Sequence, residues 1–151
     1  MILIDEKMII GTDDHLTHKV YEIALDKSYK ELRMSFKYSP KFVTEDIADG
    51  LKDYTIDHYF PEEFKTDEIT KFMKDYMTIV NVIQLSIIHD DKFVGCWNCN
   101  ETEQNSIISK DGSTLGFIDH DITPGKYTFT LSVTGAFEDI DTSLFVEAID
   151  E

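Results

Sequence analysis

The chain has 151 residues, of which 42% are hydrophobic and 29% are charged. This composition is typical of one globular domain with a real core, and it excludes a disordered chain. Lys and Arg number 14 against 30 Asp and Glu, a net charge of −16, which excludes partners that are bound through their phosphates, such as nucleic acids and anionic membrane surfaces.

Three features of the sequence indicate the cellular compartment of the protein. The longest nearly apolar run, 78–88, is too short to span a bilayer and is broken by three polar residues. The first residues lack the basic and apolar regions of a signal peptide. Only two cysteines occur, too few for a disulfide framework. We therefore expect a cytoplasmic protein.

The chain begins with strand signals. Two short apolar runs, 2–4 and 8–10, predict an edge strand or a loose N-terminal arm. Two segments with alternating apolar residues follow at 18–25 and 29–38, joined by a short turn. Alternation with period two predicts strands with one buried face. The short connection favours either an antiparallel hairpin or a corner between two sheets.

Helical spacing replaces alternation over residues 41–78. Thr44 and Thr66 are residues of a type that caps helices, and each precedes an apolar stripe. The first stripe consists of Ile47, Leu51 and Tyr54, and the second of Ile69, Phe72, Met73, Tyr76 and Met77. We interpret 41–78 as a helical insertion laid on a β-domain, with the second stripe packed into the core, which is the usual role of such a stripe.

Alternation resumes after residue 81. Strands are expected at 81–87, 106–109 and 144–148, with a loop over 96–104. The clearest signal follows the Pro-Gly turn at 124–125, where four apolar residues alternate with polar ones: Tyr127, Phe129, Leu131 and Val133. A count of about seven to nine short strands is typical of a two-layered fold. We predict one mainly all-β domain over 1–151, an antiparallel β-sandwich or jelly roll with a helical insertion at 41–78.

The order of features in the second half resembles a known domain. The residues that carry the likeness are Asn81–Gly95, Gly116–Ile118, Pro124–Thr128 and Leu144–Ala148. They resemble the β-sandwich domain that precedes the PHP-type metal-dependent phosphoesterase domain in bacterial metallohydrolases of the CehA/McbA type. More loosely, they resemble the pre-peptidase C-terminal domain of secreted proteases. The likeness spans about residues 18–149, interrupted at 40–80.

This resemblance implies an accessory module that sits beside a catalytic domain in its relatives. A PHP active site needs His-rich metal motifs, whereas none of the five histidines here forms a His-x-His pair. The segment 96–99, Cys-Trp-Asn-Cys, also departs from the family at that point. The resemblance therefore implies the fold and not the activity.

Loop residues supply the candidate ligand-binding site. Trp97, the only tryptophan, stands beside Asn98 in the predicted loop. An exposed indole there would stack on a sugar or anchor a protein interface, whereas a buried one would be part of the core. His120, just before the Pro-Gly turn, is the third candidate.

Two groups of residues are candidate metal ligands. Asp119, His120 and Asp121 are candidates for calcium, which binds clustered oxygens, although aspartates in turns usually satisfy local backbone groups. Cys96 and Cys99 have the spacing of half a zinc site or of a redox pair, and a zinc site would need two more ligands, for which His89 and His120 are available.

No motif for nucleophilic, metal-dependent or phosphate-binding catalysis occurs in the sequence. We therefore expect a non-catalytic binding or protein-interaction module with no cofactor except, as an alternative, calcium. Its partner would be a protein or a carbohydrate. Two other hypotheses stay open: a carbohydrate-binding module, and a small metal-dependent hydrolase that uses the Asp-His-Asp loop.

Overall fold

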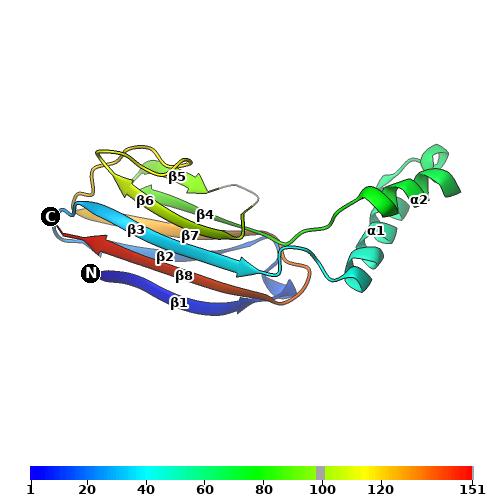
Figure 1. Cartoon of the computed structure of the whole chain (residues 1–151), viewed down its shortest axis with the longest axis horizontal. Helices are drawn as coiled ribbons and strands as arrows, with labels where there is room; N and C mark the ends of the chain where they lie inside the picture. Colours follow the sequence, from blue (N-terminus) through cyan, green and yellow to red (C-terminus); the bar gives the residue numbers. More distant parts are fainter. Residues whose placement is uncertain (98–100, 151) are drawn as a thin grey trace.

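A computed structural model of the chain describes residues 1–97 and 101–150. In these residues eight strands form two antiparallel four-stranded sheets that face each other, and two helices project from one end (Figure 1). One sheet has, in spatial order, β1 (Ile2–Ile10), β8 (Ile140–Ile149), β3 (Glu31–Ser39) and β6 (Glu103–Ser109). The other has β2 (Thr17–Leu25), β7 (Gly125–Gly135), β4 (Val82–His89) and β5 (Lys92–Trp97).

The strand pairing is nested. β1 pairs with β8, β2 with β7, β3 with β6 and β4 with β5, and every pair is antiparallel. A chain that folds into one long hairpin and is then rolled up produces this order, which is the topology of a jelly roll. The predicted mainly β sandwich or jelly roll is therefore confirmed. Because β2 and β3 lie in different sheets, the connection between them is a corner and not a hairpin.

The strand boundaries in the structure differ from the predicted ones at two places. The N-terminal runs join into one edge strand, β1. The predicted loop at 96–104 was wrong at both ends, because Cys96 and Trp97 belong to β5 and Glu103 and Gln104 belong to β6. Gly95 looked like the end of a strand in the sequence, but the register between β4 and β5 shifts beside it and pairing continues. A glycine inside a strand often marks such an irregularity.

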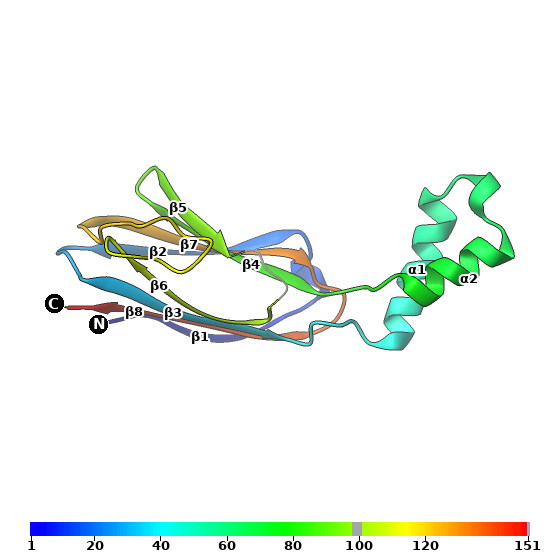
Figure 2. The ribbon, with the colours of Figure 1, turned by 45° about the horizontal axis from the view of Figure 1, so that its top comes forward.

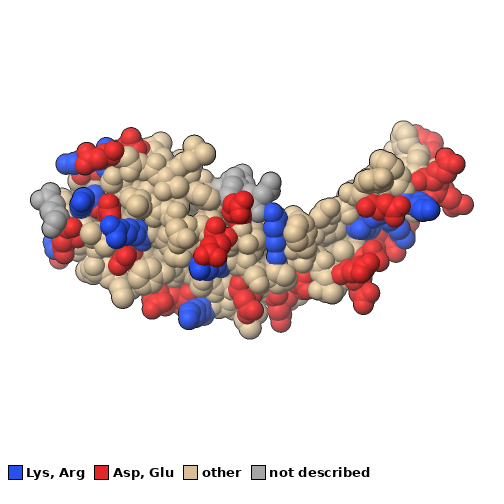
Figure 3. Space-filling view, in the orientation of Figure 1, with Lys and Arg blue, Asp and Glu red and all other residues tan. Residues whose placement is uncertain are grey.

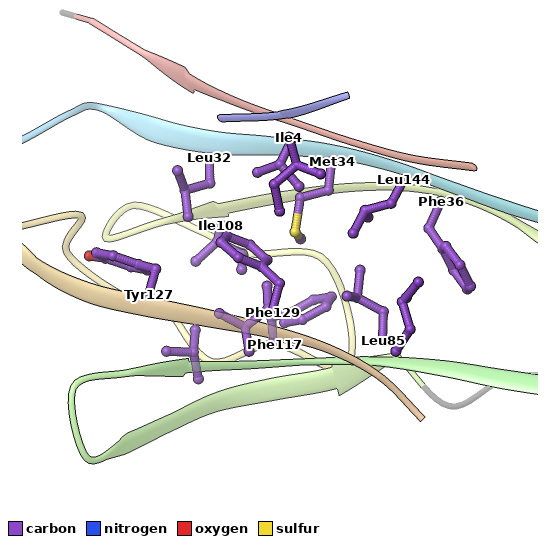
Figure 4. Packing of buried hydrophobic residues seen from close by; sticks show 14 of the residues in the cluster. Ile4, Leu32, Met34, Phe36, Leu85, Ile108, Phe117, Tyr127, Phe129 and Leu144 are labelled. Atoms are coloured by element: carbon purple, nitrogen blue, oxygen red, sulfur yellow. The ribbon is translucent and has the colours of Figure 1, made fainter. Parts of the chain in front are cut away.

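The core lies between the two sheets. The four apolar residues of β7 predicted to point inward, from Tyr127 to Val133, are all at most 1% exposed. Opposite them lie side chains of the other sheet, among them Leu32, Phe36 and Leu144 (Figure 4). β3, β4, β7 and β8 each contribute every second residue to this layer, which is why their sequences alternate.

The insertion between β3 and β4 projects away from the sandwich (Figures 1 and 2). It contains α1 (Glu45–Tyr59), a short 3-10 turn (Glu62–Phe64) and α2 (Asp67–Tyr76). The helical insertion is confirmed, but its placement on the β-domain was wrong. The two helices bury only Ala48 and Ile56 within themselves, and no residue of α2 is fully buried. The predicted core stripe of α2 is therefore a partly exposed surface.

A fixed junction joins this insertion to the sandwich. Residues 42–80, called the helical hairpin below, are closed at their base by a bridge between Phe42 and Val80. Asn81 is fully buried there; its side chain donates to Pro40 O (3.1 Å) and accepts from Phe137 N (3.0 Å). Its amide thus ties both arms of the insertion to the loop between β7 and β8.

A second junction contact holds the start of α1. Thr44 occupies the expected N-cap position, but its hydroxyl does not accept a helix N–H. It donates instead to Glu138 Oε2 (2.6 Å), while Thr44 N donates to Oε1 (2.9 Å), and these bonds lower the pKa of Glu138. Thr66, in contrast, caps α2 as predicted and accepts from Ile69 N. The hairpin therefore leaves the sandwich from a hydrogen-bonded base.

Candidate functional site

The predicted ligand-binding residues lie at opposite ends of the β4–β5 pair. Trp97 is the last residue of β5 and pairs with Leu85, whereas His120 contacts His89, where β4 ends. Four residues of extended strand separate Leu85 from His89, about 13 Å. Asn98 lies outside the described residues. The structure therefore does not bring Trp97 and His120 into one site.

Trp97 is half-buried and packs against the core. Its Nε1 is buried, and it has no hydrogen-bond partner in the described part of the chain; the same is true of Gln104 Oε1. The indole of Trp97 therefore contributes to packing. Of the aromatic side chains that the structure describes in the sandwich, only Phe93 is exposed, so no second exposed aromatic stands beside it in this part of the chain.

His120 belongs to a packed cluster with His89 and Tyr127. The distance from His89 Nδ1 to His120 Nε2 is 2.8 Å, so one imidazole donates a hydrogen bond to the other. The His89 ring stacks on Tyr127, with centroids 4.1 Å apart and planes 11° apart. Burial raises the pKa of Tyr127 to about 12, and its hydroxyl donates a hydrogen bond to Thr123 O. Burial therefore favours the neutral forms of both Tyr127 and His120, because it raises the pKa of the first and lowers the pKa of the second.

This cluster predicts a loss of stability in mild acid. Burial lowers the pKa of His120, the neighbouring His89 and Lys92 lower it further, and Asp121 opposes them. Below about pH 6.5 the unfolded chain binds a proton that the folded chain binds less readily. The contribution of neutral His120 is thus complete above the unfolded pKa and is lost as the pH falls toward the folded pKa. Urea unfolding between about pH 7.5 and pH 5 is expected to show this decline.

The control for this prediction is His120→Gln, which keeps a polar atom near the position of Nε2 but does not titrate. Its free energy of unfolding is expected to fall less steeply over the same interval. The three carboxyls with lowered pKa values, Asp14, Glu138 and Asp150, are present in both proteins, so their contribution cancels in the comparison. Equal slopes for the wild type and the variant would contradict the assignment to His120.

The three side chains of the Asp-His-Asp loop turn to different neighbours. Asp119 accepts a hydrogen bond from Ser113 N (2.8 Å), His120 turns to His89, and Asp121 lines a hollow with Lys30 and Lys110. Across residues 1–97 and 101–150, no three His, Cys, Asp or Glu side chains converge as metal ligands. Calcium binding and metal-dependent hydrolysis thus gain no support from these residues.

The candidate zinc or redox pair is only half described. Cys96 is a free, partly buried thiol on β5, and burial raises its pKa. A raised pKa disfavours the thiolate that either chemistry needs. Cys99 lies outside the described residues. His89 and His120 lie beyond Gly95, toward the other end of β5, and bond to each other.

Exposed aromatic residues gather on the helical hairpin. In the part of the chain that the structure describes, six of the seven exposed aromatic side chains belong to it: Phe42, Tyr54, Tyr59, Phe64, Phe72 and Tyr76. Phe72 and Tyr76 contact each other one turn apart, with ring centroids at 4.6 Å, and Tyr54 stacks on His58 at 3.9 Å. A concentration of exposed apolar surface on one projecting element is typical of a protein–protein contact surface.

A groove of about 720 Å³ runs along the base of the hairpin. Its apolar lining comes from both arms and includes Phe42, Ala48, Met77 and Ile79. Its charged lining includes Glu45, Asp49, Asp53 and Asp75, with Lys52 and Lys74 as the basic members. Lys74 pairs with Asp53, and Lys52 Nζ donates to Lys74 O (2.8 Å).

The predicted stripes include three of the six exposed hairpin aromatics, Tyr54, Phe72 and Tyr76, but not the other three. Phe72 and Tyr76 have the spacing of a core-facing helix, and the prediction that this stripe packs into the core was wrong. One signal pointed the other way: the apolar residues on the solvent side of the hairpin are mostly large aromatics separated by carboxylates. Aromatic residues are enriched at protein interfaces, whereas Leu, Ile and Val dominate interiors.

Neither helix in the described residues has both the length and the apolar character required to cross a membrane. No protein-family model matches the chain, and no curated protein matches it. Among solved structures, a crystal structure of a protein from Sulfurospirillum deleyianum matches with a TM-score of 0.32 and 13% identity, over 96% of this chain and 98% of that chain. A likeness at that TM-score carries no argument about fold or function.

Proposed function

We propose that this protein is a non-catalytic protein-interaction module. In this proposal the jelly roll is a rigid base, and the helical hairpin is the surface that contacts a partner. The observation that carries the proposal is the distribution of exposed aromatics in the described residues, six of seven of which lie on the hairpin. Exposed aromatic side chains contribute little to the stability of the free protein, but they are among the side chains that most often dominate binding energy when a partner covers them.

The junction supports the same proposal. Asn81 and Glu138 fix the base of the hairpin by hydrogen bonds to the sandwich. An element whose base is fixed loses less conformational freedom on binding than a loose arm would. The sandwich, with its closed core and its single exposed aromatic in the described residues, is the part that holds the surface in place.

The resemblance to accessory domains of metallohydrolases is part of this proposal. An accessory module presents a surface to a second protein, and the hairpin is the element suited to do so. The proposal also includes a cytoplasmic location, which the free thiol of Cys96 supports.

Site-specific photo-crosslinking tests the proposal. A photoreactive phenylalanine analogue is placed at Phe72 on the hairpin or, as the matched control, at Phe93 on the sandwich. These two phenylalanines have nearly the same exposed fraction, 58% and 59%. In cells of the source organism, position 72 is expected to give a discrete protein adduct and position 93 is not. Adducts of equal yield at both positions, or none at position 72, would remove the hairpin as the contact surface.

A further inference from the structure

The charges around the hairpin are strongly one-sided. Residues 42–80 contain ten Asp and Glu but only four basic residues, all lysines. Three of these lysines, Lys52, Lys65 and Lys74, already take part in ion pairs within the hairpin. Figure 3 shows acidic side chains over the free end of the hairpin. The field at this surface is therefore negative, in line with the net charge of −16.

Two carboxylates of the groove have no basic partner. Glu45 and Asp75 line it from opposite arms, and no Lys, Arg or His side chain of residues 1–97 and 101–150 lies within ion-pair distance of either. Phe42, in the same lining, is 63% exposed. Its ring already accepts a cation, since Lys41 Nζ lies 5.6 Å from the ring centroid. Apolar surface, a cation-accepting ring and unpaired carboxylates thus occur together in one groove.

We infer that this groove binds a basic segment of a partner protein, one in which Lys or Arg residues accompany aliphatic ones. The inference rests on the proposed function and names the chemistry of the partner. The ammonium or guanidinium groups would pair with Glu45 and Asp75, and the aliphatic side chains would cover Met77 and Ile79. Phe72 and Tyr76, within one turn of Asp75 on α2, extend the apolar contact beyond the groove.

The negative charge of the groove favours a basic segment over a second copy of the chain or a nucleic acid. A second copy of the chain would bring another −16 against the same carboxylates, so like charges would oppose the contact. The phosphates of a nucleic acid are also negatively charged, so these carboxylates would repel them as well. A basic segment is attracted at long range, and its aliphatic groups gain from burial once it is docked.

The test measures binding of labelled synthetic peptides to the full chain by fluorescence anisotropy. One amphipathic peptide carries leucine on one face and lysine on the other, and two further peptides carry glutamine or glutamate in place of lysine. The lysine peptide is expected to bind at least about tenfold more tightly than the glutamine peptide at low salt, and the glutamate peptide is expected not to bind. Added salt should narrow the difference between the first two.

Paired variants locate the binding. Glu45→Gln with Asp75→Asn is expected to weaken the lysine peptide about tenfold, since two carboxylates are neutralised. Asp5→Asn with Asp111→Asn makes the same change in net charge at exposed positions of the sandwich and is expected to leave the affinity within about twofold. Circular dichroism confirms that both variants keep their helices.

The outcomes separate the inference from the proposed function. If the three peptides bind alike, or the lysine peptide does not bind, or both pairs of variants weaken it equally, the inference is overturned. In each of those cases the photo-crosslinking at Phe72 still decides whether the hairpin contacts a protein. Loss of the lysine-peptide preference only in the groove variant supports the inference.

Discussion

Replacing Phe129 by alanine is expected to lower the free energy of unfolding by about 3–5 kcal/mol. Phe129 is fully buried in the middle of β7, between its strand neighbours Tyr21 and Ile87. The substitution removes most of an aromatic side chain and leaves a cavity between the sheets, because the two strands that pair with β7 hold it in place. Urea unfolding at neutral pH measures the change.

A phenylalanine-to-alanine change on the hairpin is expected to have a much smaller effect on the free energy of unfolding. Phe72→Ala removes the same atoms from a side chain that is 58% exposed and whose ring contact is Tyr76. Its expected cost is about 0.5 kcal/mol or less, the size of a one-turn side-chain pair. A loss of stability at Phe72 close to that at Phe129 would mean that the hairpin aromatics are part of a core. It would then remove the main support for a contact surface.

The strands of the sandwich could be predicted because their pattern reports burial directly. A strand with one buried and one solvent-exposed face must alternate apolar and polar residues. The apolar residues of β7 do so: Tyr127, Phe129, Leu131 and Val133. Each of the four points into the core as expected. The pairing order was beyond local reasoning, since nothing within β1 indicates that its partner is β8, more than a hundred residues later.

The sequence predicts that the hairpin is helical, but it does not predict that the apolar residues of α2 are exposed. An amphipathic stripe reports that one face of a helix is apolar, and it is silent about what covers that face. The residues that α1 buries, Ala48 and Ile56, are not those of its predicted stripe, and α2 leaves Phe72 and Tyr76 exposed. Where the insertion sits depends on the junction at Asn81, whose partners are Pro40 and Phe137.

The candidate loop residues failed as a single site for a topological reason. In a rolled-up hairpin, successive connections alternate between the two ends of the sandwich. Trp97 closes β5 opposite Leu85, midway along β4, and His120 stands where β4 ends, beside His89. Two residues that were grouped by their loop-like surroundings in the sequence are thereby about 13 Å apart along the strand. The placement of the strands had to be known before any loop residues could be grouped.

Gly95→Ala is expected to destabilise the protein by about 4 kcal/mol, because two costs add at this position. Gly95 has φ = +156°, a conformation that side chains rarely adopt. A Cβ there would also lie 2.6 Å from Phe117 Cα and closer still to the Gly116 carbonyl oxygen. Both neighbours are backbone atoms, so they cannot swing aside as the end of a flexible side chain would.

Gly112→Ala separates the two costs of the Gly95 change. Gly112 has a similar φ of +149°, but a Cβ there would meet no atom within 4 Å. Its replacement is expected to cost only the conformational part, about 1–3 kcal/mol. Urea unfolding of both variants therefore isolates the close approach of β5 to residues 116–117, where Cys96 N donates to Gly116 O (3.1 Å). Equal losses for the two variants would show that this approach contributes nothing, and that the glycine at 95 is needed only for its backbone angle.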